Sequence, residues 1–391
     1  YYQYLNDRDF ILLEQRGTQY AQPNLACPEW TAALQKANLS DLEALEEEVL
    51  YQTAALTCRD RLLAEGIDLN GYNTNESAAD VEDLRKLLGL EQYNLLTLSY
   101  GTKIAQTLMR DYPSPIRSVV LDSPLPLEVS YDEESVQNLL ETFDQIFVDC
   151  QVDSTCNASF PNLQERFYRF LGEITKNPIK LKIANPSTNQ TTSFILRGRD
   201  VAAHFGDLHS SEMPRVPLML DQVISGNYDL LQQALAESFA PPSPGNGLGA
   251  RLSVWCAEEY PFSNQVRIKA ETEKYPFIFG LSPATYSSST CEAWGVSSLG
   301  EEENQPVKSN IPTLIINGSY DNITPVKWGK KMTKNLANSV QIIFPGWHHS
   351  PTTYWDNPCG MQVANAFFND PRTKPVLECL EKIQEVEFVS H

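Results

Sequence analysis

Residues 94–101 read NLLTLSYG, an apolar run that ends in a sharp polar corner. Asn94 to Leu98 has the character of a buried strand. Gly101 to Arg110 places apolar residues three and four positions apart, which predicts a helix. Ser99 therefore lies at a tight turn between a strand and a helix. A serine in this place is either a helix cap or a nucleophile exposed for reaction.

The sequence around this turn repeats the same alternation of strand and helix. The pattern predicts helices over 40–65 and 78–88, and strands over 10–14, 116–122, 311–317 and 340–344. Strands that alternate with helices indicate a mostly parallel sheet with helices on both faces. The predicted fold class is therefore α/β.

A long insertion separates the two groups of strands. Between residues 126 and 307 the apolar spacing predicts helices and no regular alternation of strands, with helical segments at 136–147, 163–174, 217–224 and 229–240. The predicted organisation is an α/β core formed by residues 1–125 and 308–391. A large, mainly helical cap over residues 126–307 interrupts this core.

Composition excludes several classes of function. The chain has 391 residues, 42% of them hydrophobic, and a formal net charge of −20. Such a negative charge argues against a nucleic-acid or anionic-membrane partner, which would require a basic patch. No apolar stretch approaches the roughly 18–20 residues needed to span a bilayer, and the first ten residues do not resemble a signal peptide. The oligomeric state cannot be inferred.

Eight cysteines are spread along the chain, and none has the Cys-x-x-Cys spacing of a zinc or redox motif. Their even number and wide spacing indicate four disulfides and an oxidising compartment. Eight cysteines allow 105 pairings. Nearest neighbours in sequence give the expected set, Cys27–Cys58, Cys150–Cys156, Cys256–Cys291 and Cys359–Cys379. The alternative is eight buried thiols in a cytosolic protein.

Three residues that together could perform nucleophilic catalysis each follow a predicted strand. Ser99 follows 94–98, Asp321 lies in the turn after 311–317, and His349 follows 340–344. Catalytic groups gather at the carboxyl edge of a parallel sheet. A serine hydroxyl needs an imidazole to take its proton, and the imidazole needs a carboxylate to orient it. The order Ser, Asp, His is that of the α/β-hydrolases.

The scarcity of histidine narrows the choice of base. Of five histidines, only His348 and His349 follow a predicted sheet strand. We select His349 as the base and expect His348 to pack beneath it. Each member of the set has an ordinary alternative when taken alone: a helix cap for Ser99, a turn residue for Asp321, and a surface histidine for His349.

Longer stretches of the chain resemble the tripeptidyl aminopeptidase and prolyl iminopeptidase branch of the α/β-hydrolase superfamily. The matching stretches are LLEQRGTQYAQPNLACPEW (12–30), LSYGTKIAQTLMRDYPSPIRSVVLDSPLP (98–126), IPTLIINGSYDNITP (311–325) and FPGWHHS (344–350). Together with the shared CPEW and SVWCAEE segments and the sequence around Cys359, they cover most of the chain. The resemblance implies a secreted or periplasmic serine hydrolase with a helical cap over its active site. Members of this branch release N-terminal residues or short peptides, and other relatives cleave esters or amides.

The sequence departs from this family in three places. Thr97 replaces the first glycine of the Gly-x-Ser-x-Gly motif, and His348 replaces the glycine of the family's Gly-His pair. A Cβ at position 97 is expected to crowd the turn. Relatives carry a His-Gly-Gly-Pro-Gly-like segment upstream of the first strand seen here, and the N-terminal strands are expected to be missing from this chain. That segment supplies one oxyanion donor; the backbone N–H of Tyr100 is the other.

The predicted reaction is acyl transfer, without a metal or cofactor. Ser99 attacks a carbonyl of a small peptide or ester, His349 transfers the proton, and Asp321 holds His349. An aminopeptidase must also bind a free ammonium, for which Glu258 and Glu259 are the candidates; the alternative is two solvated surface glutamates. Two other functions remain open: an esterase or amidase for small hydrophobic substrates, and a non-catalytic binding protein with the hydrolase fold.

Overall fold

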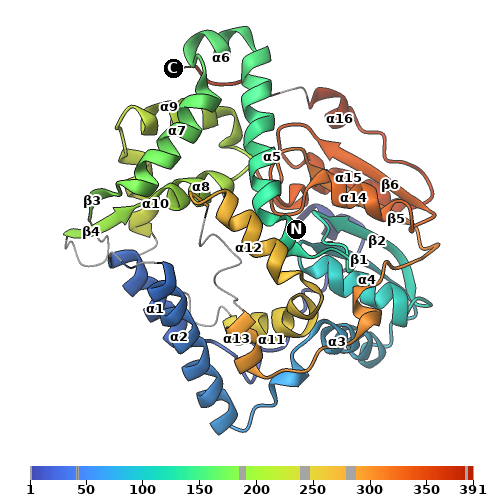
Figure 1. Ribbon diagram of the computed structural model, residues 1–391. Coiled ribbons are helices and arrows are strands. Elements are labelled where there is room, and N and C mark those ends of the chain that lie inside the picture. The colour runs from blue at the N-terminus through green and yellow to red at the C-terminus, as the bar shows by residue number, and fades with distance from the viewer. Residues whose placement is uncertain are drawn as a thin grey trace.

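The computed structural model describes residues 2–40, 42, 44–184, 191–237, 247–278, 288–383 and 386–390. A four-stranded parallel sheet forms its core, in the order β1-β2-β5-β6. The sheet lies on the right of Figure 1 and most of the insertion on the left. Its strands are β1 (Tyr93–Leu98), β2 (Ile116–Asp122), β5 (Thr313–Gly318) and β6 (Ser339–Phe344).

Helices cover both faces of this sheet. Val120, Leu314 and Ile316 point to the face that α15 (Cys359–Asn369) covers. Their neighbours in the same strands point to the opposite face, because successive side chains of a strand alternate. That face is covered by α3 (Thr74–Leu87), α4 (Gly101–Asp111) and α14 (Val326–Met332). The predicted α/β class is confirmed.

The N-terminal strand prediction is wrong. Residues 10–14 form no strand, and Ile11 and Leu12 are 51% and 68% exposed. A strand needs a neighbour for its backbone hydrogen bonds, and the described residues provide none beside this segment. For a related reason β1 is half-buried rather than buried: among the described strands it forms an edge of the sheet, with β2 as its single partner.

The segment between β2 and β5 is mainly helical, as the sequence predicts. It also contains an antiparallel hairpin, β3 (Ile179–Ala184) with β4 (Thr191–Leu196), that the sequence analysis missed. Residues 179–183 alternate apolar residues with lysine, the two-residue period of a half-buried strand. The helices are α5 (Tyr131–Val152), α6 (Ser154–Ser159), α7 (Leu163–Lys176), α8 (Gly198–Gly206), α9 (Val216–Ile224), α10 (Asp229–Glu237), α11 (Leu248–Glu258), α12 (Gln265–Lys274) and α13 (Ser288–Trp294).

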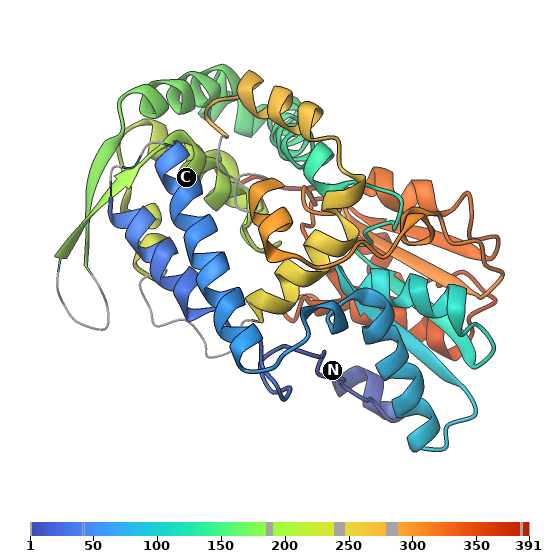
Figure 2. The ribbon, with the colours of Figure 1, turned by 60° about the horizontal axis from the view of Figure 1, so that its bottom comes forward.

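Two early helices pack away from the sheet. The helices α1 (Pro28–Leu39) and α2 (Ala44–Ala64) share one apolar cluster with α11 and α13. In Figure 2 they run alongside the insertion. We call this cluster the helical junction; it joins buried residues of 25–69 to those of 248–294. This packing joins residues of the expected core to residues of the expected cap. The domain limits at 125 and 308 therefore remain a prediction.

Short elements complete the chain. Three-residue to five-residue 3-10 helices occur within the connections, and one short α-helix, α16 (Glu378–Lys382), follows α15. The 3-10 helices are Tyr2–Asn6, Leu69–Gly71, Met213–Arg215, Tyr260–Phe262, Glu301–Asn304 and Pro351–Thr353. Among the described helices, none has both the length and the apolar character that crossing a lipid bilayer requires.

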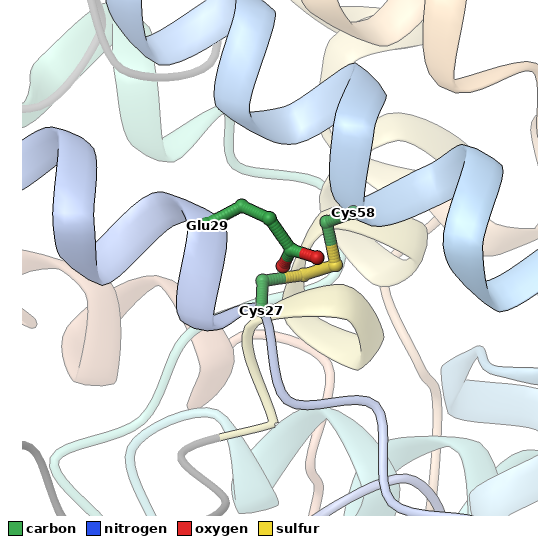
Figure 3. Close-up of side chains that lie close together, drawn as sticks. All are labelled: Cys27, Glu29 and Cys58. Atoms are coloured by element: carbon green, nitrogen blue, oxygen red, sulfur yellow. A yellow bond between two sulfur atoms is a disulfide. The ribbon is translucent and has the colours of Figure 1, made fainter.

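All four expected disulfides are present, so the pairing between sequence neighbours is confirmed. Two of them, Cys27–Cys58 and Cys256–Cys291, lie in the helical junction. The Glu29 carboxylate lies beside the first (Figure 3), where Arg61 donates to it. Bonded sulfurs are not thiolate ligands, so this group is not a metal site. Four disulfides point to an oxidising compartment outside the cytoplasm.

Removing a disulfide is expected to destabilise the chain according to the loop that it closes. Cys27–Cys58 closes 31 residues and Cys150–Cys156 only 6. In the chain-entropy treatment, replacing the first pair with serine costs about 4 kcal/mol and replacing the second about 2 kcal/mol. Urea unfolding of the two double-serine variants measures both values. Equal losses, or a larger loss for the short loop, would contradict the expectation.

Candidate active site

Ser99 occupies the sharp turn between β1 and α4. Its φ is +50°, a left-handed conformation that side chains other than glycine seldom adopt. Two backbone hydrogen bonds hold it: its N–H donates to Asp122 O at 3.0 Å, and its carbonyl accepts from Thr102 N at 2.9 Å. A serine in a strained strand-to-helix turn has the backbone of a nucleophile elbow.

Thr97 fits this turn without crowding it. Its hydroxyl donates to Val120 O at 3.1 Å across the neighbouring strand. A Cβ built at Gly101, on the other side of the turn, would lie 3.9 Å from the Thr97 Cβ, an ordinary van der Waals contact. The side chain expected to clash is therefore accommodated because it points toward β2 rather than into the turn.

Asp321 and His349 meet directly. Asp321 lies just past β5 and His349 just past β6, and Nδ1 of the imidazole is 2.9 Å from Asp321 Oδ2. Asp321 also accepts hydrogen bonds from the backbone N–H groups of Ile323 and Thr324, at 2.9 and 2.8 Å. The Thr324 hydroxyl bonds the same carboxylate and lies 3.1 Å from His349 Nδ1. These contacts fix the orientation of the Asp321 carboxylate. Both contacts to the imidazole of His349 use Nδ1, so Nε2 is the ring nitrogen that Asp321 and Thr324 do not engage.

The electrostatics of this pair favour opposite charges. Burial alone would lower the pKa of His349, but the charge and hydrogen bond of Asp321 outweigh it and raise the pKa above its ordinary value. Burial opposes ionisation of Asp321 as well, yet His349 holds the pKa of that carboxyl below its usual range. The imidazole therefore accepts a proton more readily than an isolated histidine does.

Among the described residues, His348 forms its hydrogen bonds with partners other than Asp321. Its Nε2 contacts Asn322 Oδ1 at 2.6 Å, and its backbone N–H donates to Ser210 at 2.9 Å. The side chain is buried, and burial lowers its pKa. The hydrogen-bonding partner of Asp321 is thus His349, the histidine selected from the sequence, while its neighbour packs against the insertion.

The loops of Ser99 and His349 meet at the end of β2. The backbone carbonyl of Asp122 accepts a hydrogen bond from the Ser99 N–H. Its carboxylate accepts one from the Thr352 N–H at 2.7 Å. Ser123 accepts the Ser350 N–H on its hydroxyl at 2.9 Å. Sequence reasoning missed this corner. The rule that selected Ser99, Asp321 and His349, a polar residue at a strand's carboxyl end, also selects Asp122.

A cavity of about 330 Å³ opens beside Ser99. Within the described residues, the backbone N–H of Tyr100 has no acceptor, as an oxyanion donor requires. A second cavity, of about 270 Å³, shares Tyr131 and Ile323 with the first and extends between α5 and α8. Much of the first cavity's wall is apolar: Leu125, Tyr131, Ala250, Val254, Trp255 and Ile323.

A buried charge cluster lies next to this cavity. Lys103 on α4 donates to Glu259 Oε1 at 2.5 Å and lies 3.6 Å from Glu258 Oε2. Glu258 also accepts from the backbone and hydroxyl of Thr74, both at 2.6 Å, and does not line the cavity, whereas Glu259 and Lys103 do. Burial would lower the pKa of Lys103, but the two carboxylates outweigh it and raise the pKa.

Sequence reasoning missed Lys103 because lysine on a predicted helix is ordinarily solvated. The signal was its position, four residues past Ser99 on a helix whose other residues are mostly small or apolar. Asp132 on α5 was missed too. Its Oδ2 accepts from Trp255 Nε1 at 2.8 Å, and burial raises its pKa to about 7.

A parallel sheet covered by helices on both faces, with a serine elbow and an aspartate–histidine pair at its carboxyl edge, defines an α/β-hydrolase. Comparison with protein families agrees. A family described as "alpha/beta hydrolase fold" matches residues 3–189, and one described as "TAP-like protein" matches residues 275–379. The chain belongs to the α/β-hydrolase superfamily, and its C-terminal part is TAP-like.

Individual relatives are distant. The serine protease Hip1 of Mycobacterium tuberculosis (strain H37Rv) is 21% identical over 314 residues, which are 76% of this chain and 59% of Hip1. The putative hydrolase YuaR of Escherichia coli (strain K12) is 24% identical over 352 residues, 86% of this chain and 66% of YuaR. A thermophilic esterase from Thermogutta terrifontis matches 77% of this chain and 74% of its own, with 13% identity and a TM-score of 0.34.

Proposed function

We propose that this chain is a serine hydrolase and that Ser99, His349 and Asp321 form its catalytic triad. The observation that carries the proposal is the 2.9 Å contact between Asp321 and His349, at the same sheet edge as the strained turn of Ser99. The carboxylate fixes the tautomer of the imidazole by accepting from Nδ1, so that Nε2 is the nitrogen that acts as base.

The reaction in this proposal is acyl transfer through a covalent intermediate. The Ser99 Oγ bonds to the carbonyl carbon while its proton passes to His349 Nε2, and the Tyr100 N–H stabilises the oxyanion. His349 then gives the proton to the leaving amine or alcohol, and the bond to that group breaks. Water attacks the acyl-enzyme in the same manner, and the proton returns to Ser99 as the acid leaves.

We further propose that the substrate is a short peptide cleaved near its free N-terminus. Its ammonium group would contact Glu259, which lines the cavity. Among the described residues, Lys103 is the one cation that ion-pairs with both Glu258 and Glu259, so two carboxylates share it. An incoming ammonium would balance the remaining charge. This balance supports an exopeptidase, although Glu258 is already bound to Thr74.

Blocking the substrate's amine is expected to reduce cleavage of peptide anilides about 100-fold, because an uncharged amide loses the contact with Glu259. A charge-assisted hydrogen bond in a buried site is worth about 1.5–3 kcal/mol. Turnover of tripeptidyl- and aminoacyl-anilides, each with and without an N-acetyl group, measures the effect. Discrimination should shrink in Glu259→Gln.

The control is Glu292→Gln, an exposed glutamate that contacts Tyr260 outside the cavity. It should keep the full preference for a free amine. Equal turnover of free and acetylated anilides by the unaltered protein would contradict the exopeptidase proposal. The apolar wall of the cavity supports a second candidate, an esterase for small hydrophobic substrates, and rapid turnover of p-nitrophenyl esters alone would favour it.

We also propose that the protein acts after secretion, outside the cell or in the periplasm. The support is its four disulfides, since such bonds persist in oxidising compartments. Thiol labelling under denaturing conditions, applied to protein isolated from its native compartment, tests this point: eight reduced cysteines would all react, whereas four disulfides would leave none to react.

A further inference from the structure

Asp122 is a buried carboxylate at the centre of the site. The triad mechanism gives it no role. It is the last residue of β2, with no exposed surface. β2 lies between β1 and β5, and Asp122 pairs with Leu98 on one side and Ile316 on the other. It therefore lies between the strand that leads to Ser99 and the strand that leads to Asp321.

The carboxylate of Asp122 is tied to the loop that carries His349. Its Oδ2 accepts from the backbone N–H of Thr352 at 2.7 Å and from the Thr352 hydroxyl at 2.5 Å. The adjacent Ser123 hydroxyl donates to Asp122 Oδ1 at 3.3 Å and accepts from Ser350 N at 2.9 Å. Two anchors thus lie one and three residues beyond His349.

The same residue holds the nucleophile's turn through its backbone. The Asp122 carbonyl accepts the Ser99 N–H at 3.0 Å. Ser99, Ser123 and Ser350 are all left-handed, with φ of 50°, 51° and 61°. Strained conformations of this kind persist only where the surrounding contacts over-determine them, and here these contacts converge on residues 122 and 123.

We propose that Asp122 is a positioning residue and the second carboxylate of this site, which fixes the His349 loop and supports the imidazolium formed during acyl transfer. The inference rests on the proposed function, since it needs His349 to act as a base. Asp321 bonds the imidazole directly. Asp122 acts through the loop and through its charge, in the low-dielectric interior where such charges act strongly.

Several ionisable groups act on His349. Asp321 follows β5, Asp122 ends β2, Asp207 follows α8, and His348 precedes it in the same loop. Burial raises the pKa of Asp122 to about 7 despite the hydrogen bonds from Thr352. Its negative charge is therefore lost as the pH falls through neutrality. While present, that charge raises the pKa of His349, so removing it should lower that pKa.

The test is the pH profile of kcat/KM for Asp122→Asn, which keeps an oxygen acceptor for Thr352 but carries no charge. The acidic limb, which reports the free base His349, should move to lower pH. The plateau of kcat should fall about tenfold because the imidazolium loses support. The matched control, Ser123→Ala, removes the Ser350 anchor and leaves the Asp122 charge. It should lower kcat without moving the limb.

An unshifted limb in a folded Asp122→Asn variant, confirmed by its thermal unfolding curve, would overturn the inference. If the variant does not fold, carbon-detected NMR of the unaltered protein replaces it. The Asp122 carboxyl should then titrate near neutral pH, and the His349 ring should respond at the same pH; absence of either response would overturn the inference. Failure of the unaltered protein to hydrolyse any substrate would instead overturn the proposed function.

Discussion

Ser99→Ala is expected to lose hydrolysis and covalent labelling by a fluorophosphonate together. Removing the nucleophile of a serine triad lowers kcat by about 10⁶, because the remaining members have no hydroxyl to activate. The labelling assay needs no knowledge of the natural substrate, and intact mass spectrometry reports the bound phosphonyl group directly. The same experiment on Asp321→Asn should show slow labelling, since a triad without its carboxylate loses about 10⁴.

The control for this loss is Ser159→Ala, an exposed serine at the end of α6. It should label at the rate of the unaltered protein. Labelling that persists in Ser99→Ala would locate the nucleophile elsewhere. An unaltered protein that never labels would favour the non-catalytic binding protein with the hydrolase fold, the alternative that the sequence left open.

Lys103→Met is expected to destabilise the chain by about 3–5 kcal/mol. The lysine is 2% exposed, and its ion-pair partners Glu258 and Glu259 are 4% and 3% exposed. Methionine fills a similar volume but leaves two buried carboxylates without their cation, the costly way to break a buried ion pair. The free energy of urea unfolding measures the loss.

A second substitution distinguishes charge from packing. Adding Glu259→Gln to Lys103→Met should restore part of the stability, because one of the uncompensated charges is removed. Lys327→Met is the surface control: Lys327 bonds Glu141 at 2.9 Å with both side chains largely exposed, so its loss should cost less than about 1 kcal/mol. A loss for Lys103→Met as small as this control would contradict the buried-charge explanation.

The placement of Ser99, Asp321 and His349 followed from sequence because each depends on local signals. A short apolar run that ends in a polar turn locates the carboxyl end of a strand, and parallel strands bring those ends to one edge. The pairing of cysteines followed from proximity along the chain. The α/β class needed only the alternation of strands and helices.

What the sequence could not give depends on contacts between distant segments. Residues 10–14 have the apolar pattern of a strand, but the part of the chain that the structure describes offers them no strand to pair with. Lys103 belongs in the interior only because Glu258 and Glu259, more than 150 residues later, meet it there. The Asp122 carboxylate is held by a hydrogen bond from Thr352, which lies 230 residues later in the chain. Secondary-structure propensity and the spacing of apolar residues carry no information about such long-range contacts.

The helical junction sets an order of events for the newly made polypeptide. Its early part ends near residue 69, and its late part is not complete until residue 294. At ribosomal rates of about 5–20 residues per second, the apolar faces of α1 and α2 wait on the order of tens of seconds for their partners. Throughout that interval the exposed apolar faces of α1 and α2 are a natural target for holding chaperones. A ribosome that stalls before α13 would release an incomplete chain that is prone to aggregate.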